Sequence, residues 1–90
     1  MTQYSILTVD LNNEVSNEKR TRFYNHLQKK KWIKINNLST LWYAIWRGTP
    51  TAQEMMETTR DDIEGAAMHS GVSRYDVALA NCGKPIVWSK

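Results

Sequence analysis

The sequence has a single cysteine, Cys82, and only 2 prolines and 4 glycines among its 90 residues. One cysteine excludes an intramolecular disulfide, and so little proline and glycine argues against a low-complexity or disordered chain. No apolar run approaches the roughly 18 residues that a membrane-spanning helix needs. The start, MTQYSILTVD, lacks the basic segment and cleavage site of a signal peptide. We therefore expect one cytoplasmic domain over residues 1–90 with no membrane partner.

Several motifs that carry chemistry are also absent. No cysteine or histidine cluster has metal-ligand spacing, because His26 and His69 stand alone and Cys82 has no companion. There is no P-loop and no G-x-G-x-x-G, and Ser70-Gly71 lacks the context of a nucleophile elbow. The sequence therefore predicts no nucleotide cofactor, and it favours both histidines as surface or helix-packing residues.

The pattern of apolar residues predicts alternating strands and helices. Strands are expected at 4–11, 32–36, from Leu41 within the stretch 38–48, and at 75–80, with a short extra strand at 86–88. Helices are expected at 18–30, and from a capping box at Thr51 and Glu54 to Gly71. The order is βαββαβ, the split βαβ arrangement. We predict a ferredoxin-like α+β fold in which both helices cover one face of a four-stranded antiparallel sheet.

The stretch LSTLWYAIWRG carries strand-forming side chains on both faces. One set is Leu41, Tyr43 and Ile45, and the other is Trp42, Ala44 and Trp46. In the expected fold this strand is central, and only one of its faces meets the helices. The alternation does not say which set faces them. Apolar sets on both faces favour a homodimer through the open face of the sheet, with interface residues at Trp42, Tyr43 and Trp46.

The charge is unevenly distributed along a chain whose net charge is only +3. Seven basic residues and one acid lie between Glu18 and Lys34, whereas five acids and one base lie between Glu54 and Glu64. One interpretation is nucleic-acid binding, with RNA or DNA phosphates contacted by Arg20, Arg22, Lys29, Lys30 and Lys31. The other is that the basic helix simply complements the acidic one.

Asp10 ends a strand that is otherwise rich in apolar residues. Together with a second carboxylate it would hold a hydrated Mg²⁺, and a two-fold dimer would supply a copy of the same residue. Asp10 is thus the candidate catalytic and metal-binding residue, with Glu14 as a weaker second. The simpler interpretation is that Asp10 accepts backbone hydrogen bonds in the turn at 11–13.

The predicted elements together resemble a known family, the small CRISPR-associated subunit of spacer acquisition, and its structural relatives among toxin–antitoxin ribonucleases, including the GhoS-type antitoxins. The resemblance covers about residues 4 to 80 and rests on the βαββαβ order, the strand ILTVDL with Asp10 at its end, the helix EKRTRFYNHL and the strand LWYAIWRG. It implies a homodimer in which the tail strand Ile86–Trp88 adds to the partner's sheet, which makes Trp88 an interface residue. It also implies an Asp10 pair that binds Mg²⁺ and assists hydrolysis of RNA or DNA.

Two functions follow as expectations. The first is a small nucleic-acid-binding protein that acts as a metal-dependent endoribonuclease of toxin–antitoxin or phage-defence type. The second is a non-catalytic interaction module, such as an antitoxin or a phage-encoded inhibitor or regulator, which uses the aromatic strand and the basic helix to bind another protein. Dependence on Asp10 distinguishes the two.

Overall fold

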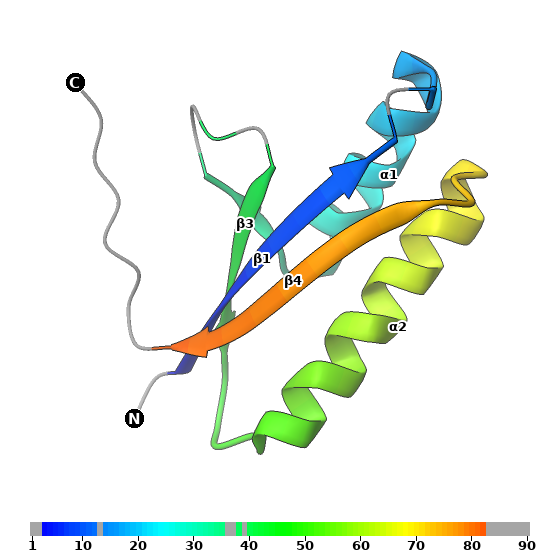
Figure 1. Ribbon diagram of the computed structural model, residues 1–90. Helices are drawn as coiled ribbons and strands as arrows, with labels where there is room; N and C mark the ends of the chain where they lie inside the picture. The colour runs from blue at the N-terminus through cyan, green and yellow to red at the C-terminus, as the bar shows by residue number, and fades with distance from the viewer. Residues whose placement is uncertain (1–2, 13, 36–37, 39, 83–90) are drawn as a thin grey trace.

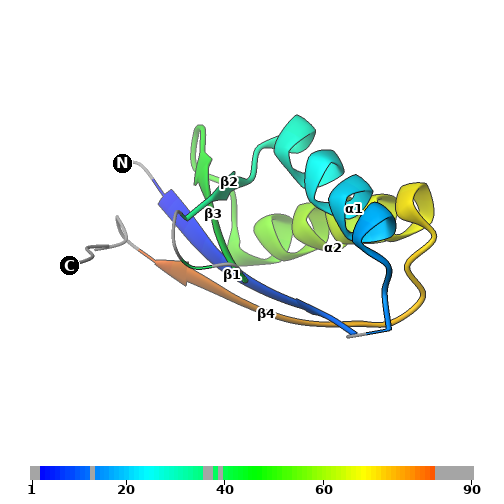
Figure 2. The same ribbon diagram turned by 90° about the horizontal axis from the view of Figure 1, so that it is seen from above.

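The computed structural model describes residues 3–12, 14–35, 38 and 40–82 (Figure 1). Its elements are β1 (Gln3–Leu11), α1 (Asn17–Lys30), β2 (Ile33–Lys34), β3 (Leu41–Trp46), α2 (Ala52–Ser70) and β4 (Tyr75–Cys82). The strands form an antiparallel sheet in the order β2-β3-β1-β4. Both helices lie on one face of it (Figure 2). The predicted ferredoxin-like fold is confirmed, and the predicted strand at 86–88, with Trp88, lies outside the described residues.

The helices begin and end where the sequence places their caps. The Ser16 side chain accepts a hydrogen bond from the Lys19 amide at the start of α1, and Thr51 and Glu54 form a complete capping box at the start of α2. Gly71 ends α2 in the left-handed conformation, with φ 79°, which glycine adopts without steric cost. Neither helix is long and apolar enough to cross a membrane, as far as the described residues extend.

The register of β3 decides which of its faces meets the helices. Trp42 lies opposite Leu7 and Ala44 lies opposite Ser5, and all four are fully buried at 0% exposure. Trp46 follows on the same face at 8% exposure. Because cross-strand partners share a face, Trp42 and Trp46 are core residues, and their predicted place at an interface is wrong. Tyr43, opposite Ile6 and Ile33, lies on the open face.

Helix α1 contacts α2 through His26. A Cβ atom at Gly65 would lie 3.0 Å from Nε2 of His26, so the missing side chain of Gly65 makes room for the imidazole. The ring of His69 lies 5.4 Å from that of His26, measured between centroids. Nε2 of His26 is buried and has no hydrogen-bond partner among the described residues. Gly65 therefore allows α1 to approach α2 closely at His26.

This contact predicts a loss of stability in weak acid. Burial, with help from Lys30, His69 and Lys29 and against Asp62, lowers the pKa of His26 below 6.5. The unfolded chain then binds more protons than the folded one, so the stabilisation is complete above pH 6.5 and declines as the pH falls below it. We expect urea denaturation to give a lower free energy of unfolding at pH 5.5 than at pH 7.5. The difference should shrink most in His26→Gln and less in His69→Gln, because His69 is a smaller cause than burial. Equal pH dependence in wild type and His26→Gln would contradict this assignment.

Candidate functional site

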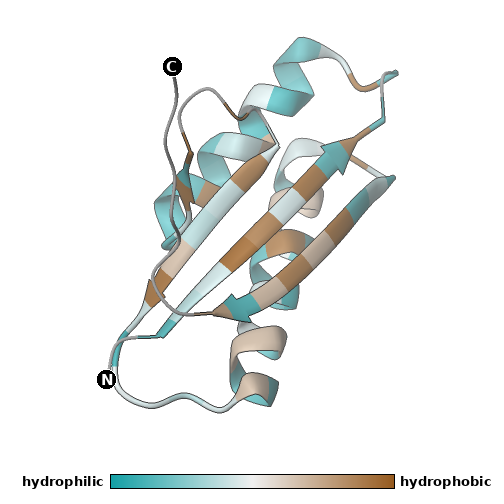
Figure 3. Ribbon diagram, turned by 60° about the vertical axis from the view of Figure 1, so that its left-hand side comes forward, coloured by the Kyte–Doolittle hydropathy of each residue, from teal (hydrophilic) through white to brown (hydrophobic). Residues whose placement is uncertain are grey.

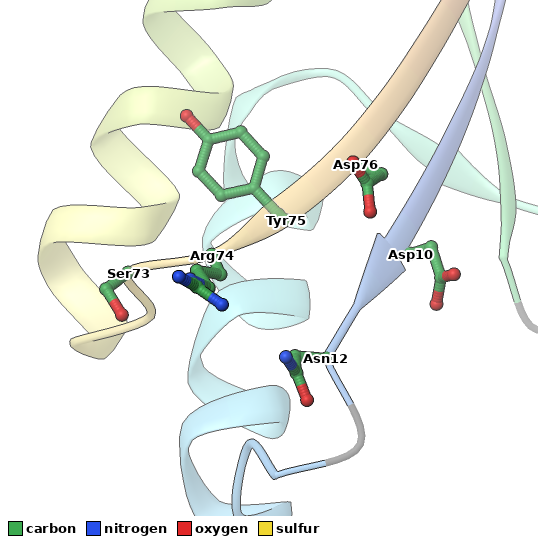
Figure 4. A pocket seen from close by; sticks show the side chains of 6 residues that line it. All are labelled: Asp10, Asn12, Ser73, Arg74, Tyr75 and Asp76. Carbon is green, nitrogen blue, oxygen red and sulfur yellow. The ribbon is translucent and has the colours of Figure 1, made fainter.

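Two aspartates lie side by side at one end of the sheet. Asp10 is the penultimate residue of β1, and it is the direct cross-strand partner of Asp76, the second residue of β4. Both side chains are exposed, on the face of the sheet that the helices leave open. Figure 4 shows the two carboxylates projecting from neighbouring strands. The chain thus brings two carboxylates together without a second copy of itself.

These aspartates line a surface pocket of about 530 Å³. Its lining residues are Asp10, Asn12, Ser73, Arg74, Tyr75 and Asp76. They come from two segments, the end of β1 with its following turn, and the loop before β4 with the first two residues of that strand (Figure 4). Arg74 lines the same pocket, which thus combines a carboxylate pair with a cation suited to phosphate oxygens.

The turn after β1 is organised by Asn12. The Glu14 amide donates to Oδ1 of Asn12 at 2.9 Å, the Val15 amide donates to its carbonyl oxygen at 2.9 Å, and Nη2 of Arg20 donates to the same carbonyl at 3.2 Å. Within the described segments, the side chain that caps this turn is therefore Asn12. The simpler interpretation of Asp10 involves Asn13, which lies outside the described residues, and the Asp10 side chain lines the pocket.

An aspartate opposite an aspartate is unfavourable for the fold. Like charges directly across an antiparallel pair destabilise a sheet by about 0.2–1 kcal/mol relative to neutral residues. Neither carboxylate has an ion pair or hydrogen bond within the described ranges. Both carboxylates are exposed, so they remain accessible to solvent and to ligands.

The pair fits some metal ions better than others. The described residues contain no group of three or more histidine, cysteine, aspartate or glutamate side chains able to hold a metal ion. A catalytic zinc site normally needs three protein ligands, whereas Mg²⁺ keeps several waters and is often held by one or two carboxylates and a substrate phosphate. Asp10 and Asp76 therefore match Mg²⁺ in ligand type and number.

The basic residues predicted to bind nucleic acid have differing surroundings. Arg20 is bonded to the Asn12 carbonyl, Arg22 pairs with Glu18 at 2.6 Å, and Lys31 pairs with the buried Asp62 at 3.0 Å. The Lys31 ammonium also lies 5.0 Å from the centroid of the Trp46 ring. Lys29 and Lys30 are exposed near the end of α1, away from the pocket. The pocket thus does not include any of these five residues.

Sequence reasoning identified Asp10 but missed Asp76 and Arg74. A signal was present, because Asp76 falls in the alternating set opposite Val77 and Leu79, and β4 neighbours β1 in the expected topology. The missing step was the register of β1 against β4, since a shift of one residue would have placed Asp76 on the helix side.

Comparison with protein-family models finds no match, and comparison with curated proteins also finds none. Among solved structures, the chain is similar to the crystal structure of protein SP2199 from Streptococcus pneumoniae, with a TM-score of 0.55 and 11% sequence identity. The similarity covers 96% of this chain and 90% of that one. At this identity the likeness concerns the fold alone, and the two chains share the α+β arrangement over nearly their whole lengths.

Proposed function

We propose that this protein binds nucleic acid at the Asp10–Asp76 pocket and cleaves its phosphodiester bonds with the help of a divalent cation. The observation that carries the proposal is the direct cross-strand pairing of these two exposed aspartates in a pocket that also contains Arg74. Carboxylates bind hard cations, and a guanidinium binds phosphate oxygens in a fixed, bidentate geometry. Metal-assisted phosphodiester hydrolysis can use both kinds of group around the reacting phosphate.

Each residue has a distinct task in this proposal. Asp10 and Asp76 hold the cation from two adjacent strands, which fixes their separation more firmly than a loop would. A bound Mg²⁺ supplies Lewis-acid stabilisation of the phosphate oxygens. Arg74 donates hydrogen bonds to the same phosphate and offsets the negative charge that develops during hydrolysis. Asn12 holds the turn below the pocket, so that the wall keeps its shape.

Cleavage of end-labelled single-stranded RNA and of duplex DNA tests the proposal directly. We expect cutting with Mg²⁺ or Mn²⁺ that is abolished by EDTA, and the preferred polymer identifies the substrate as RNA or DNA. The Asp10→Asn variant, purified in the same way, controls for contaminating nucleases and should be inactive. Asp61→Asn changes an exposed aspartate on α2 and should retain activity. A folded wild-type protein that cuts neither polymer would contradict the proposal and favour the non-catalytic interaction module.

The proposal includes a homodimer through the open face of the sheet. Away from the two aspartates this face is apolar, with Ile33 at 42% and Ile45 at 44% exposure beside the half-buried Ile6 and Tyr43. In Figure 3 the sheet lies in front of the helices, and hydrophobic bands follow its strands. A second copy presents a matching uncharged surface, and a 90-residue chain gains more from added burial than a large one does.

Replacement of Ile45 with aspartate should dissociate this dimer. A charge at the centre of an apolar contact must be desolvated without a partner, which costs several kcal/mol. Light scattering after size-exclusion chromatography should give a dimeric mass for wild type and a monomeric mass for Ile45→Asp. Met68→Asp, at a position 86% exposed on α2, is the matched control and should remain dimeric. If wild type is monomeric at all concentrations tested, the homodimer proposal is wrong, and the open face would be a candidate contact for a different protein.

A further inference from the structure

A second pocket of about 260 Å³ adjoins the carboxylate pocket. The two share Asn12, Ser73 and Arg74 as lining residues, and together we call them the end groove. The part beyond Arg74 is lined by Glu14, Val15, Ser16, Lys19, Gly71 and Val72 as well. These residues come from the first turn of α1, the turn before it and the loop that follows α2. The end groove therefore leads from the two aspartates to the start of α1.

The charge changes sign along the end groove. Asp10 and Asp76 lie at one end, Arg74 lies in the shared part, and Lys19 lies at the other end with Glu14 as the acid near it. The aliphatic part of Lys19 packs beside Gly71, since its Cε would lie 3.6 Å from a Cβ atom there. Over the described ranges, no ion pair or side-chain hydrogen bond occupies the Lys19 ammonium or the Arg74 guanidinium. Both cations are thus available to a ligand.

This availability distinguishes Lys19 and Arg74 from three of the five basic residues that the sequence singled out. Arg20, Arg22 and Lys31 each have a partner within the protein. Lys29 is ten residues further along α1, which at 1.5 Å per residue places it about 15 Å from Lys19. A nucleic-acid strand bound in the end groove would contact Lys19 before it reached the lysines at the C-terminal end of α1.

We propose that Lys19 binds the phosphate that neighbours the reacting one, which the proposed function assigns to Asp10, Asp76 and Arg74, so that the substrate is a polynucleotide strand and not a mononucleotide or an isolated diester. The inference rests on the proposed function. A nucleic-acid strand carries one phosphate per nucleotide, so a strand with one phosphate at the carboxylate pair presents the next to a neighbouring surface. Along the end groove that surface lies beyond Arg74 and carries Lys19. The aspartates act on the reacting phosphate, and Lys19 sets the length and direction of the strand.

Lys19→Gln tests this arrangement, because glutamine keeps a long polar side chain at this position and removes the charge. The probes are a labelled oligonucleotide of the polymer that wild type prefers and bis(p-nitrophenyl) phosphate, a single diester with no neighbouring phosphate. We expect kcat/KM to fall about tenfold more for the oligonucleotide than for the small diester, mainly through KM. The magnitude of the slope of log affinity against log salt concentration should decrease by about 1, the value expected for the loss of one phosphate contact. Lys19→Arg should restore oligonucleotide cleavage, and Lys29→Gln on the same helix should have no such effect.

Two results would overturn the inference. One is an equal loss on both substrates, which would place Lys19 at the reacting phosphate or in the fold. The other is an equal loss in Lys19→Gln and Lys29→Gln, which would indicate diffuse attraction by the whole helix. If wild type cuts neither substrate, the proposed function fails, and binding of a fluorescent oligonucleotide in Ca²⁺ decides the inference separately. Weaker binding by Lys19→Gln than by Lys29→Gln would then support it, and equal binding would refute it.

Discussion

Replacement of Trp42 with alanine is expected to lower the free energy of unfolding by about 3–5 kcal/mol. The indole is fully buried at 0% exposure, and its ring centroid lies 5.5 Å from that of Tyr24, between the central strand β3 and helix α1. Its Nε1 has no hydrogen-bond partner within the described structure, so the loss arises from packing and the cavity left behind. A domain of this size has a total stability of roughly 5–13 kcal/mol. The variant should therefore lose a large fraction of the total stability and unfold at a lower temperature than wild type.

Urea denaturation of Trp42→Ala measures the loss of unfolding free energy, and Tyr43→Ala is the control variant. Tyr43 is the next residue on the same strand but lies half-buried on the open face, so in the monomer its truncation should cost well under half as much. The comparison is made at protein concentrations low enough to keep the chain monomeric, because Tyr43 also lies on the proposed dimer face. Equal losses in the two variants would mean that both faces of β3 are covered within one chain.

The aromatic strand illustrates what sequence can and cannot determine. Alternation identified the two sets of side chains, and the order of elements placed the strand in the middle of the sheet. The choice of face remained open because both sets are apolar, so hydrophobicity favoured neither. Pairing with β1 decides it, because Leu7, Val9 and Leu11 form the buried apolar part of one face of β1, whereas Thr8 and Asp10 make the other face polar at its end.

Polar groups in the core were harder to predict than apolar ones. Ser5 is fully buried, accepts a hydrogen bond from Nε1 of Trp46 at 2.8 Å and donates one to Oδ1 of Asn81 at 2.6 Å. Asp62 is buried and accepts from Lys31 and from Nε1 of Trp32, each at 3.0 Å. Each network joins residues 30 or more positions apart, and no local pattern in the sequence signals such partners.

Only the part of the candidate site that depends on a local pattern could be predicted from the sequence. Asp10 is conspicuous because it ends an apolar strand, and this local anomaly is visible in one segment. Asp76 and Arg74 become relevant only when the register sets β4 beside β1, and Lys19 only when α1 begins next to the loop after α2. Residues of the basic helix were attractive by composition, but three of the five are engaged within the protein. Local charge density therefore overestimated their availability.

Asp76→Asn is expected to reduce activity and raise stability at once. The variant keeps the size and polarity of the side chain and removes one of the two charges that face each other across β1 and β4. Relief of this repulsion should raise the free energy of unfolding by about 0.2–1 kcal/mol. Loss of one of two cation ligands should lower metal-dependent cleavage at least 100-fold, on the scale of several kcal/mol that a catalytic cation contributes.

The combination of Asp76→Asn with Asp10→Asn separates a shared site from two independent ones. If both carboxylates hold one cation, the double variant should be no less active than the worse single variant, because either substitution already removes the site. Its stability should resemble that of the single variants, since one substitution is enough to abolish the repulsion. Asp61→Asn should change neither property. Lower stability in Asp76→Asn would show that the carboxylate serves the fold, and multiplicative losses of activity would show that the two aspartates act separately.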